Sequence, residues 1–204
     1  RSFFKEEREW VRRMLVQEKP DFVHAHWTYE YTLGTLASGL PYLVTAHDAP
    51  WNVLRHNFIP YRIARTYMAI RALSGTRQLS TVSPYVARHL RRYLGYRKPI
   101  RVIPNGMPDK VFSLQKTVGL GEEVVFATVL NGWGGYKNGG AAIQAFNGYL
   151  KAGGQGRMIM FGATHGPGEE AEQWAQAQGC QQGVEFAGRV PHAALIRRLA
   201  EEVD

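Results

Sequence analysis

The residues best placed to do chemistry in this sequence directly follow short apolar runs that are typical of buried parallel strands. His47 and Asp48 follow the run at 41–46, and Lys137 ends a glycine-rich stretch after the run at 123–130. Ligands of open parallel sheets bind beyond the carboxyl ends of the strands. The same rule selects further strand-end positions, which are His26, Trp27, Ser83, Asn105, Gly106, the loop 131–138 and the residues from Gly162 onward.

His47 could hydrogen-bond a substrate hydroxyl, act as an acid or a base, or bind a metal ion. No second ligand stands at a metal-binding spacing, so we expect no metal site. A histidine at a strand end is also commonly structural, and nothing in its immediate neighbours decides between these roles.

The stretch 131–138, Asn-Gly-Trp-Gly-Gly-Tyr-Lys-Asn, indicates a loop that joins a strand to a helix. Backbone amides and the helix dipole favour a phosphate at such a place, and Lys137 would add a mobile positive charge. It is neither a Walker motif nor a dinucleotide motif, because no Gly-Lys-Ser/Thr follows and Lys137 occupies the third glycine position. Taken alone, the stretch is more typical of a flexible turn with a surface lysine.

Other polar and aromatic residues near these strand ends have simpler interpretations. Ser83 followed by Pro84 is typical of a helix N-cap, and a Gly-x-Ser-x-Gly nucleophile motif is absent. Trp51, Trp133 and Tyr136 could stack on a ligand or pack locally.

The order of the elements predicts an α/β fold, because short apolar strands alternate with longer helical patterns. We expect strands at 21–26, 41–46, 78–82, 100–103, 123–130, 157–162 and 184–186. We expect helices at 3–17, 29–37, 61–73, 84–94, 138–151, 169–178 and 192–202.

Charge divides the chain into two predicted domains, 1–113 and 114–204, joined by a Pro- and Gly-rich linker at 104–121. The first contains 18 Lys/Arg and 8 Asp/Glu, the second 7 and 9, so their net charges are +10 and −2. The basic excess could meet anionic lipid headgroups, a phosphorylated substrate or nucleic acid, or could be a solvated helix face.

Composition excludes several classes of protein. The chain has 204 residues, 45% of them hydrophobic, and one cysteine, Cys180, which rules out an internal disulfide framework and a cysteine-rich zinc site. No apolar run approaches the roughly 20 residues of a membrane-spanning helix. We expect a cytoplasmic protein.

Taken in order, these motifs resemble family 4 of the retaining glycosyltransferases, which have the GT-B fold. The acceptor-side resemblance rests on Asp-Phe-Val-His-Ala-His at 21–26, Gly-Leu-Pro at 39–41, Val-Thr-Ala-His-Asp at 44–48, Thr-Val-Ser at 81–83 and Val-Ile-Pro-Asn-Gly at 102–106. The donor-side resemblance rests on 131–138, the strand ending at Gly162, and Phe-Ala-Gly-Arg-Val-Pro at 186–191.

The resemblance implies two Rossmann-like domains with parallel sheets, both incomplete. Residues 1–113 would be the C-terminal part of the acceptor-side domain, and 114–204 the N-terminal part of the domain that binds the nucleotide sugar. The implied reaction moves a sugar from a donor such as a UDP- or GDP-sugar to a glycan, lipid-linked or small-molecule acceptor, with retention at the anomeric carbon. No metal ion or cofactor is implied, and the protein could contact an anionic membrane at its inner face.

The resemblance also implies roles for individual residues. Lys137 matches the lysine that contacts the donor diphosphate, in a donor loop with Gly132, Trp133 and Asn138. His47 matches the histidine near the transferred sugar and is the predicted catalytic residue. The residues expected to line the cleft are Asp48, Ser83, Asn105 and Gly106.

The sequence departs from the family pattern at the donor site. Gly132 stands five residues before the lysine, where members commonly carry an arginine, so one bidentate phosphate clamp would be missing. We also expect the first acceptor-side strands and a Glu-x7-Glu segment to lie outside residues 1–204, and therefore expect these residues alone to be inactive.

Three other functions remain open. A GT-B nucleotide-sugar epimerase shares the architecture, although its catalytic carboxylates are not recognisable. A non-catalytic nucleotide-sugar-binding module would also explain the altered donor loop. The hypothesis of nucleic-acid binding rests only on the positive net charge, because no nucleic-acid-binding motif is visible. We expect no nucleic-acid partner.

Overall fold

The computed structural model describes residues 4–112, 114, 123–134 and 137–204, which form two compact units. Unit 1 is 1–106 and unit 2 is 107–204. The division lies inside the predicted linker 104–121, whereas the sequence placed the domain boundary after residue 113.

Unit 1 is built on parallel strands in the order β1-β2-β3-β4. Its elements are α1 (Lys5–Glu18), β1 (Val23–His26), α2 (Glu30–Ser38), β2 (Tyr42–Ala46), α3 (Pro50–His56), α4 (Pro60–Gly75), β3 (Leu79–Thr81), α5 (Pro84–Tyr93) and β4 (Arg101–Val102). Ala25 is level with Val44, and Val44 with Leu79, so apolar side chains line up across the strands. These side chains, with Val86 and Leu90 of α5, form the core of the unit.

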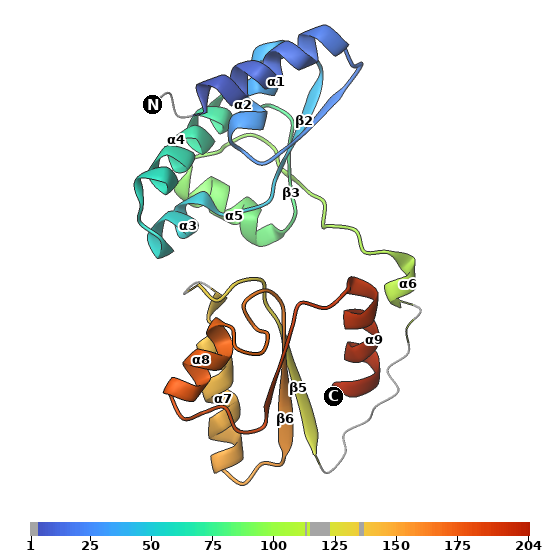
Figure 1. Cartoon of the computed structure of the whole chain (residues 1–204). Coiled ribbons are helices and arrows are strands. Elements are labelled where there is room, and N and C mark those ends of the chain that lie inside the picture. Colours follow the sequence, from blue (N-terminus) through green and yellow to red (C-terminus); the bar gives the residue numbers. More distant parts are fainter. Residues whose placement is uncertain (1–3, 113, 115–122, 135–136) are drawn as a thin grey trace. The chain divides into compact units, whose positions relative to one another are not determined.

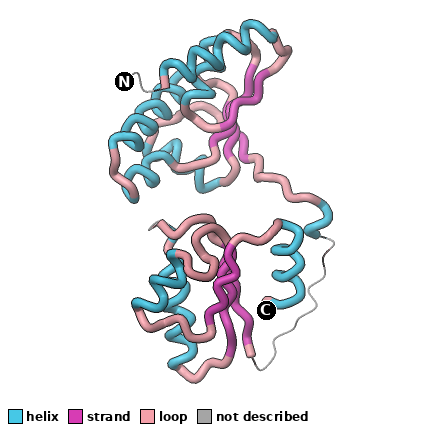
Figure 2. Tube along the Cα trace, in the orientation of Figure 1, coloured by secondary structure: helices cyan, strands magenta, loops and turns pink. Residues whose placement is uncertain are grey.

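Unit 2 has parallel strands in the order β5-β6-β7. Its elements are α6 (Asp109–Phe112), β5 (Val124–Val129), α7 (Gly139–Lys151), β6 (Gly156–Phe161), α8 (Glu170–Ala177), β7 (Val184–Gly188) and α9 (His192–Glu202). Helices α7 and α8 cover one face of this sheet and α9 covers the other (Figure 1). In unit 2 the strands lie between helices (Figure 2), and the parallel sheets of both units confirm the predicted α/β fold class.

Two helices were not predicted from the sequence. No helix is expected between the strand at 41–46 and the helix at 61–73, but Pro50 starts α3 there, at a position where its missing N–H costs no helical hydrogen bond. Helix α6 has four residues, too few to show a helical period. No helix in the described residues is both long and apolar enough to cross a membrane.

Glycine is required where β6 ends beside β5. Gly162 has φ of +124°, and a Cβ there would lie 1.6 Å from the carbonyl oxygen of Leu130. The backbone of Leu130 also donates to Phe161 O at 2.9 Å, so the two strand ends cannot easily separate. The close approach fixes the start of the loop 131–138 relative to the end of β6.

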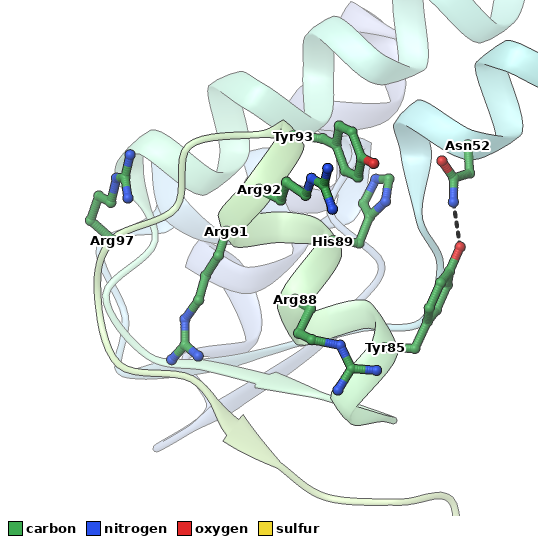
Figure 3. A pocket seen from close by; sticks show the side chains of 8 residues that line it. All are labelled: Asn52, Tyr85, Arg88, His89, Arg91, Arg92, Tyr93 and Arg97. Carbon is green, nitrogen blue, oxygen red and sulfur yellow. Dashed lines mark hydrogen bonds between the residues drawn. The ribbon is translucent and has the colours of Figure 1, made fainter.

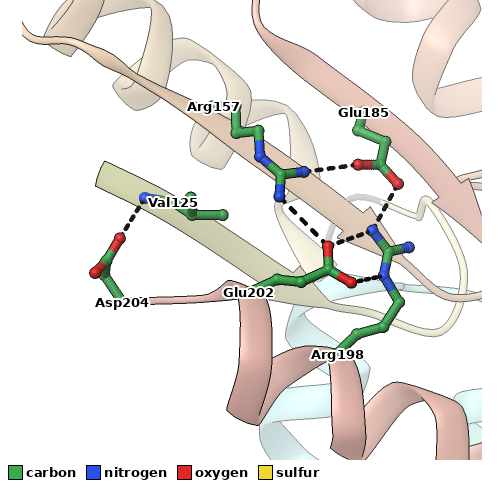
Figure 4. Close-up of polar contacts among 6 residues, drawn as sticks. All are labelled: Val125, Arg157, Glu185, Arg198, Glu202 and Asp204. Carbon is green, nitrogen blue, oxygen red and sulfur yellow. Dashed lines mark hydrogen bonds and ion pairs between the residues drawn. The ribbon is translucent and has the colours of Figure 1, made fainter. Parts of the chain in front are cut away.

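An ion-pair network ties α9 to the sheet of unit 2 (Figure 4). Arg198 binds Glu202 at 2.6 Å and Glu185 of β7 at 2.8 Å, and Arg157 of β6 binds the same two carboxylates at 3.3 and 3.0 Å. Asp204 continues the attachment by accepting a hydrogen bond from Val125 N at 2.7 Å. Each carboxylate therefore contacts two guanidinium groups. This network fixes the position of α9 against β6 and β7.

We predict that Gly162→Ala destabilises the chain by more than about 2 kcal/mol, because the new methyl group collides with backbone and adopts an unfavourable φ. The matched control is Gly148→Ala on the exposed side of α7, where a Cβ meets nothing within 4 Å. That change should stabilise by about 0.5–1 kcal/mol through helix propensity. Urea unfolding measures the free energy of unfolding of both variants. Equal changes in the two variants would contradict the close approach of Gly162 to Leu130.

We predict that Glu202→Gln lowers the free energy of unfolding by up to about 1 kcal/mol, since these side chains are partly exposed. The hydrogen bond from Arg198 lowers the pKa of Glu202. The ionised Glu202 carboxylate therefore contributes its full stabilisation of the fold above the pKa of the unfolded state, about 4.3. This stabilisation is lost as the pH falls through the pKa of Glu202 in the folded state. Urea unfolding at pH 7 and below pH 4 tests this, with the exposed Glu201→Gln as control. A difference that persists at low pH would contradict the assignment.

Candidate functional site

Polar side chains cross one face of the sheet in unit 1. His24 Nε2 lies 2.7 Å from Thr45 Oγ1, which lies 2.7 Å from Ser80 Oγ. Thr45 and Ser80 are buried, and His24 shares its strand face with His26. The chain of hydrogen bonds links three neighbouring strands and satisfies polar groups inside the unit.

His47 follows β2 and contacts His26 at the end of β1. The distance from His26 Nδ1 to His47 Nε2 is 2.7 Å, so one ring donates and the other accepts. Partial burial, followed by the neighbouring His26, lowers the pKa of His47, and Asp48 opposes this shift. His47 is therefore largely neutral at pH 7, a state in which its ring can both accept and donate a hydrogen bond.

Trp27 adds an aromatic wall beside this histidine pair. Its ring centroid lies 5.2 Å from that of His47, its side chain is 40% exposed, and its backbone has a φ of +73°. Trp27 N also donates to Thr45 O at 2.9 Å, which holds this unusual backbone in place. A positive φ in a bulky residue is uncommon and is found often at functional sites.

Asp48, the residue after His47, is held by a tyrosine of unit 1. Its Oδ2 accepts a hydrogen bond from Tyr29 OH at 2.7 Å, and the guanidinium of Arg65 lies 3.7 Å from the centre of the Tyr29 ring. Burial raises the pKa of Asp48, against the hydrogen bond from Tyr29 and the charge of Arg65. Burial also raises the pKa of Tyr29, so its hydroxyl remains a donor. These contacts anchor the residue that follows His47.

The other residues predicted to line a cleft occupy two further strand ends. Ser83 caps α5 by accepting a hydrogen bond from Val86 N at 3.2 Å, so its expected capping role is confirmed. Asn105 and Gly106 are exposed in the segment after β4. Whether Asp48, Ser83, Asn105 and Gly106 line a cleft stays a prediction.

In unit 2, the loop 131–138 connects β5 to α7 as predicted. Lys137 N donates to Gly134 O at 2.8 Å, and Asn138 adopts a left-handed conformation with φ of 55° at the N-cap of α7. Lys137 thus directly precedes the helix N-terminus, where the helix dipole attracts anions. Tyr136 lies outside the described residues.

Gly132 has a φ of +93°, a backbone conformation that an arginine would rarely adopt. Side-chain-bearing residues rarely adopt this conformation, and Gly132 N donates to Ala163 O at 3.2 Å, which holds it there. The path of the loop therefore depends on the absence of a side chain at this position.

The indole of Trp133 packs inside unit 2. Its ring lies 5.4 Å from that of Trp174 and 5.7 Å from that of His165, and a Cβ on Gly139 would lie 2.7 Å from it. The packing seats the loop on the first turn of α7, where glycine leaves room for the indole. A contact of Trp133 with a donor stays a prediction.

His165 was not singled out by the sequence. It is fully buried, its Nδ1 lies 2.7 Å from Ala163 O, and its Nε2 has no hydrogen-bond partner among the described residues. Because the carbonyl must accept, Nδ1 carries the proton and Nε2 is an acceptor. Its position four residues after β6 was the signal available, since strand ends were already the candidate positions.

The described residues contain no group of three or more His, Cys, Asp or Glu that could hold a metal ion.

We predict that His26→Ala raises the pKa of His47 toward the ordinary value near about 6.5, because the change removes the neighbouring ring and exposes His47 to water. The pKa is measured from the imidazole proton shifts by NMR titration. His56→Ala, which removes an exposed histidine of α3, is the control and should leave His47 unchanged. An unchanged or lower pKa in His26→Ala would contradict the contact.

Comparison with known proteins gives the same architecture. A glycosyltransferase from Rickettsia africae ESF-5 superposes with a TM-score of 0.60 and 14% identity, covering 96% of this chain and 53% of that one. The structure of MnaA from S. aureus with UDP gives a TM-score of 0.56 and 11% identity, covering 96% and 55%. At these identities the likeness establishes the GT-B fold. The chain spans about half the length of these solved chains, and no curated protein sequence matches it.

The sequence itself matches Glycosyltransferase Family 4 over residues 2–110, which is more than half of the chain. The match includes His26, His47, Asp48 and Ser83, the strand-end residues described in unit 1. The chain therefore belongs to glycosyltransferase family 4.

Proposed function

We propose that the protein moves a sugar from a nucleotide-diphosphate donor to a glycan, lipid-linked or small-molecule acceptor, with retention at the anomeric carbon. One observation carries the proposal: in a chain of this family, the loop 131–138 after β5 brings Lys137 to the N-terminus of a 13-residue helix. That arrangement favours a diphosphate, the leaving group of such a transfer.

The donor phosphates are assigned to the start of α7. Helix α7 has no acidic residue in its first turn, and Asn138 makes no side-chain capping bond, so the first turn itself carries no negative group that would compete with a phosphate. Positive charge from the helix dipole and from Lys137 would act together. We assign Gly132, Trp133 and Asn138 to the same donor loop, with Gly132 and Trp133 setting its path.

In the proposed reaction the bond from the anomeric carbon to the diphosphate oxygen breaks, and the electron pair stays on the diphosphate. The acceptor oxygen forms the new bond on the same face of the sugar, and its proton passes to the departing phosphate oxygen. Lys137 and the amides at the start of α7 stabilise the charge that develops on the leaving group. This scheme assigns the stabilisation to protein groups and uses neither a metal ion nor a cofactor.

His47 is assigned to a hydroxyl group of the transferred sugar. Its ring is largely neutral and is oriented by His26, and it stands beside the exposed indole of Trp27, which offers an apolar face to a sugar ring. Asp48 would hold this segment in place through Tyr29. A cytoplasmic location and a contact with an anionic membrane stay predictions of the sequence.

We predict that Lys137→Ala weakens the binding of UDP or GDP by about tenfold, because one charge-assisted hydrogen bond to phosphate is lost. Isothermal titration calorimetry on the 204-residue chain measures the dissociation constants. Lys151→Ala removes the same charge at the other end of α7 and should leave them unchanged. Equal weakening by both variants would point to general electrostatics and contradict the assignment.

Product analysis separates the transferase from the two alternative functions. A form of the protein extending beyond residues 1–204 is incubated with a sugar nucleotide, with and without acceptor, and the products are resolved by chromatography. We expect a glycosylated acceptor and free nucleoside diphosphate, both lowered by His47→Ala. An epimerised sugar nucleotide formed without acceptor would establish an epimerase, and binding without turnover would favour a binding module.

A further inference from the structure

The basic character of unit 1 is concentrated in one continuous segment. Residues 49–108 contain no Asp or Glu, and their eleven Lys/Arg are Arg55, Arg62, Arg65, Arg71, Arg77, Arg88, Arg91, Arg92, Arg97, Lys98 and Arg101. Within this segment no cation can be neutralised by a neighbour in sequence. Any compensation has to come from elsewhere in the fold or from a ligand.

Four of these arginines surround one pocket of about 480 Å³ (Figure 3). Helix α5 and the segment after it contribute Arg88, Arg91, Arg92 and Arg97, and the remaining lining residues are Asn52, His89 and two tyrosines. In the described part of the chain none of the four guanidinium groups forms an ion pair. The lining contains no carboxylate.

The pocket has fixed walls. Asn52 of α3 donates a hydrogen bond to Tyr85 OH of α5, which joins the two helices across the opening. The rings of His89 and Tyr93 lie 5.0 Å apart, and the guanidinium of Arg92 lies 5.4 Å from the centre of the Tyr93 ring. A ligand would therefore meet side chains that packing already orients.

His89 is the feature that a solvated basic surface does not explain. It is only 3% exposed, and its Nε2 accepts a hydrogen bond from Trp51 N at 3.3 Å. The proton of the neutral ring is therefore on Nδ1, which is buried and has no hydrogen-bond partner among the described residues. Burial lowers the pKa of His89 and so favours this neutral form. A buried donor without an acceptor is costly, and an acceptor entering the pocket would satisfy it.

Helix electrostatics explains only part of the cluster. Arg91 and Arg92 stand in the last turn of α5, where cations interact favourably with the helix dipole. Arg88 is a turn earlier, Arg97 lies beyond the helix, and the dipole provides no acceptor for His89. An oxyanion in the pocket would provide an acceptor for both kinds of group, because guanidinium groups bind phosphate in a bidentate manner and the imidazole supplies one further N–H.

We propose that this pocket is a binding site for a phosphate group of a small ligand, held by Arg88, Arg92 and the Nδ1–H of His89. The site lies within unit 1 and is separate from the donor loop at Lys137. It is linked to the candidate sugar site through the short segment from His47 to Trp51, whose amide contacts His89. A phosphorylated acceptor, free phosphate and a phospholipid headgroup share this chemistry.

The first test is an NMR titration of the 204-residue chain with inorganic phosphate at constant ionic strength, followed at the Trp51 amide. We expect a saturable shift of that amide. In the double variant Arg88→Gln/Arg92→Gln the affinity should fall at least tenfold. The control Arg71→Gln/Arg77→Gln removes the same charge from unit 1 outside the pocket and should change the affinity less than twofold. No saturable shift, or equal losses in both double variants, would overturn the proposal.

Two further variants locate the phosphate. His89→Phe keeps a ring of similar volume without the N–H and should weaken binding; if its circular dichroism shows unfolding, the exposed arginine variants decide the question. Lys137→Ala should leave the Trp51 shift intact. Loss of the shift in Lys137→Ala would place the phosphate in unit 2 and overturn the proposal. The assignment of the donor loop would remain valid.

Vesicles distinguish a soluble ligand from a membrane surface. The chain is sedimented with phosphatidylglycerol–phosphatidylcholine vesicles and with pure phosphatidylcholine vesicles, with and without inorganic phosphate. A Trp51 shift with phosphate and no sedimentation indicates a soluble phosphorylated ligand, whereas sedimentation that phosphate reverses indicates that the pocket takes a headgroup phosphate. Sedimentation with anionic vesicles that phosphate does not reverse, together with no shift at Trp51, would show that the arginines form a membrane surface and that the pocket proposal is wrong.

Discussion

Parallel pairing of the strands is the constraint on which the candidate sites depend. In a parallel sheet every strand ends at the same edge, so residues far apart in the sequence become neighbours there. His26 and His47 meet at 2.7 Å because β1 and β2 are paired in register. In unit 2 the same geometry brings the loop after β5 against the loop after β6, and the absence of a Cβ at Gly162 permits the contact.

The two units use this edge for different chemistry. Unit 1 presents neutral and aromatic groups, His47 and Trp27, which suit the hydroxyl groups and the apolar face of a sugar. Unit 2 presents a helix N-terminus and Lys137, which suit a diphosphate. The path of the loop 131–138 depends on Gly132, whose positive φ disfavours the arginine that the family resemblance implies at this position. In the proposed reaction, electrostatic stabilisation of the leaving group would therefore depend more strongly on Lys137 and the helix.

The alternation of apolar runs and helical periods was sufficient to predict the parallel strands and the α/β class, and strand-end logic selected His47, Ser83 and Lys137. Periodicity could not reveal α3, which begins at Pro50 and has seven residues, or α6, which spans a single turn. Side-chain contacts between elements could not be predicted from the sequence either. The His26–His47 pair, the burial of Trp133 and the donor on His89 each depend on side chains that come together only through packing. For His89, the decisive partner is a backbone amide 38 residues earlier.

The most direct test of this account is to map by NMR where UDP contacts the 204-residue chain. The account predicts that amide shifts concentrate at the carboxyl edge of the unit 2 sheet, in 130–139 and 162–166, and that Gly139 and Gly140 at the start of α7 are among those that move most. Shifts concentrated at the opposite edge, in 153–156 and 181–183, or confined to unit 1, would contradict it. Such a result would show that the glycine-rich loop is not the donor site. The proposal of sugar transfer at this edge of the sheet would then have no support.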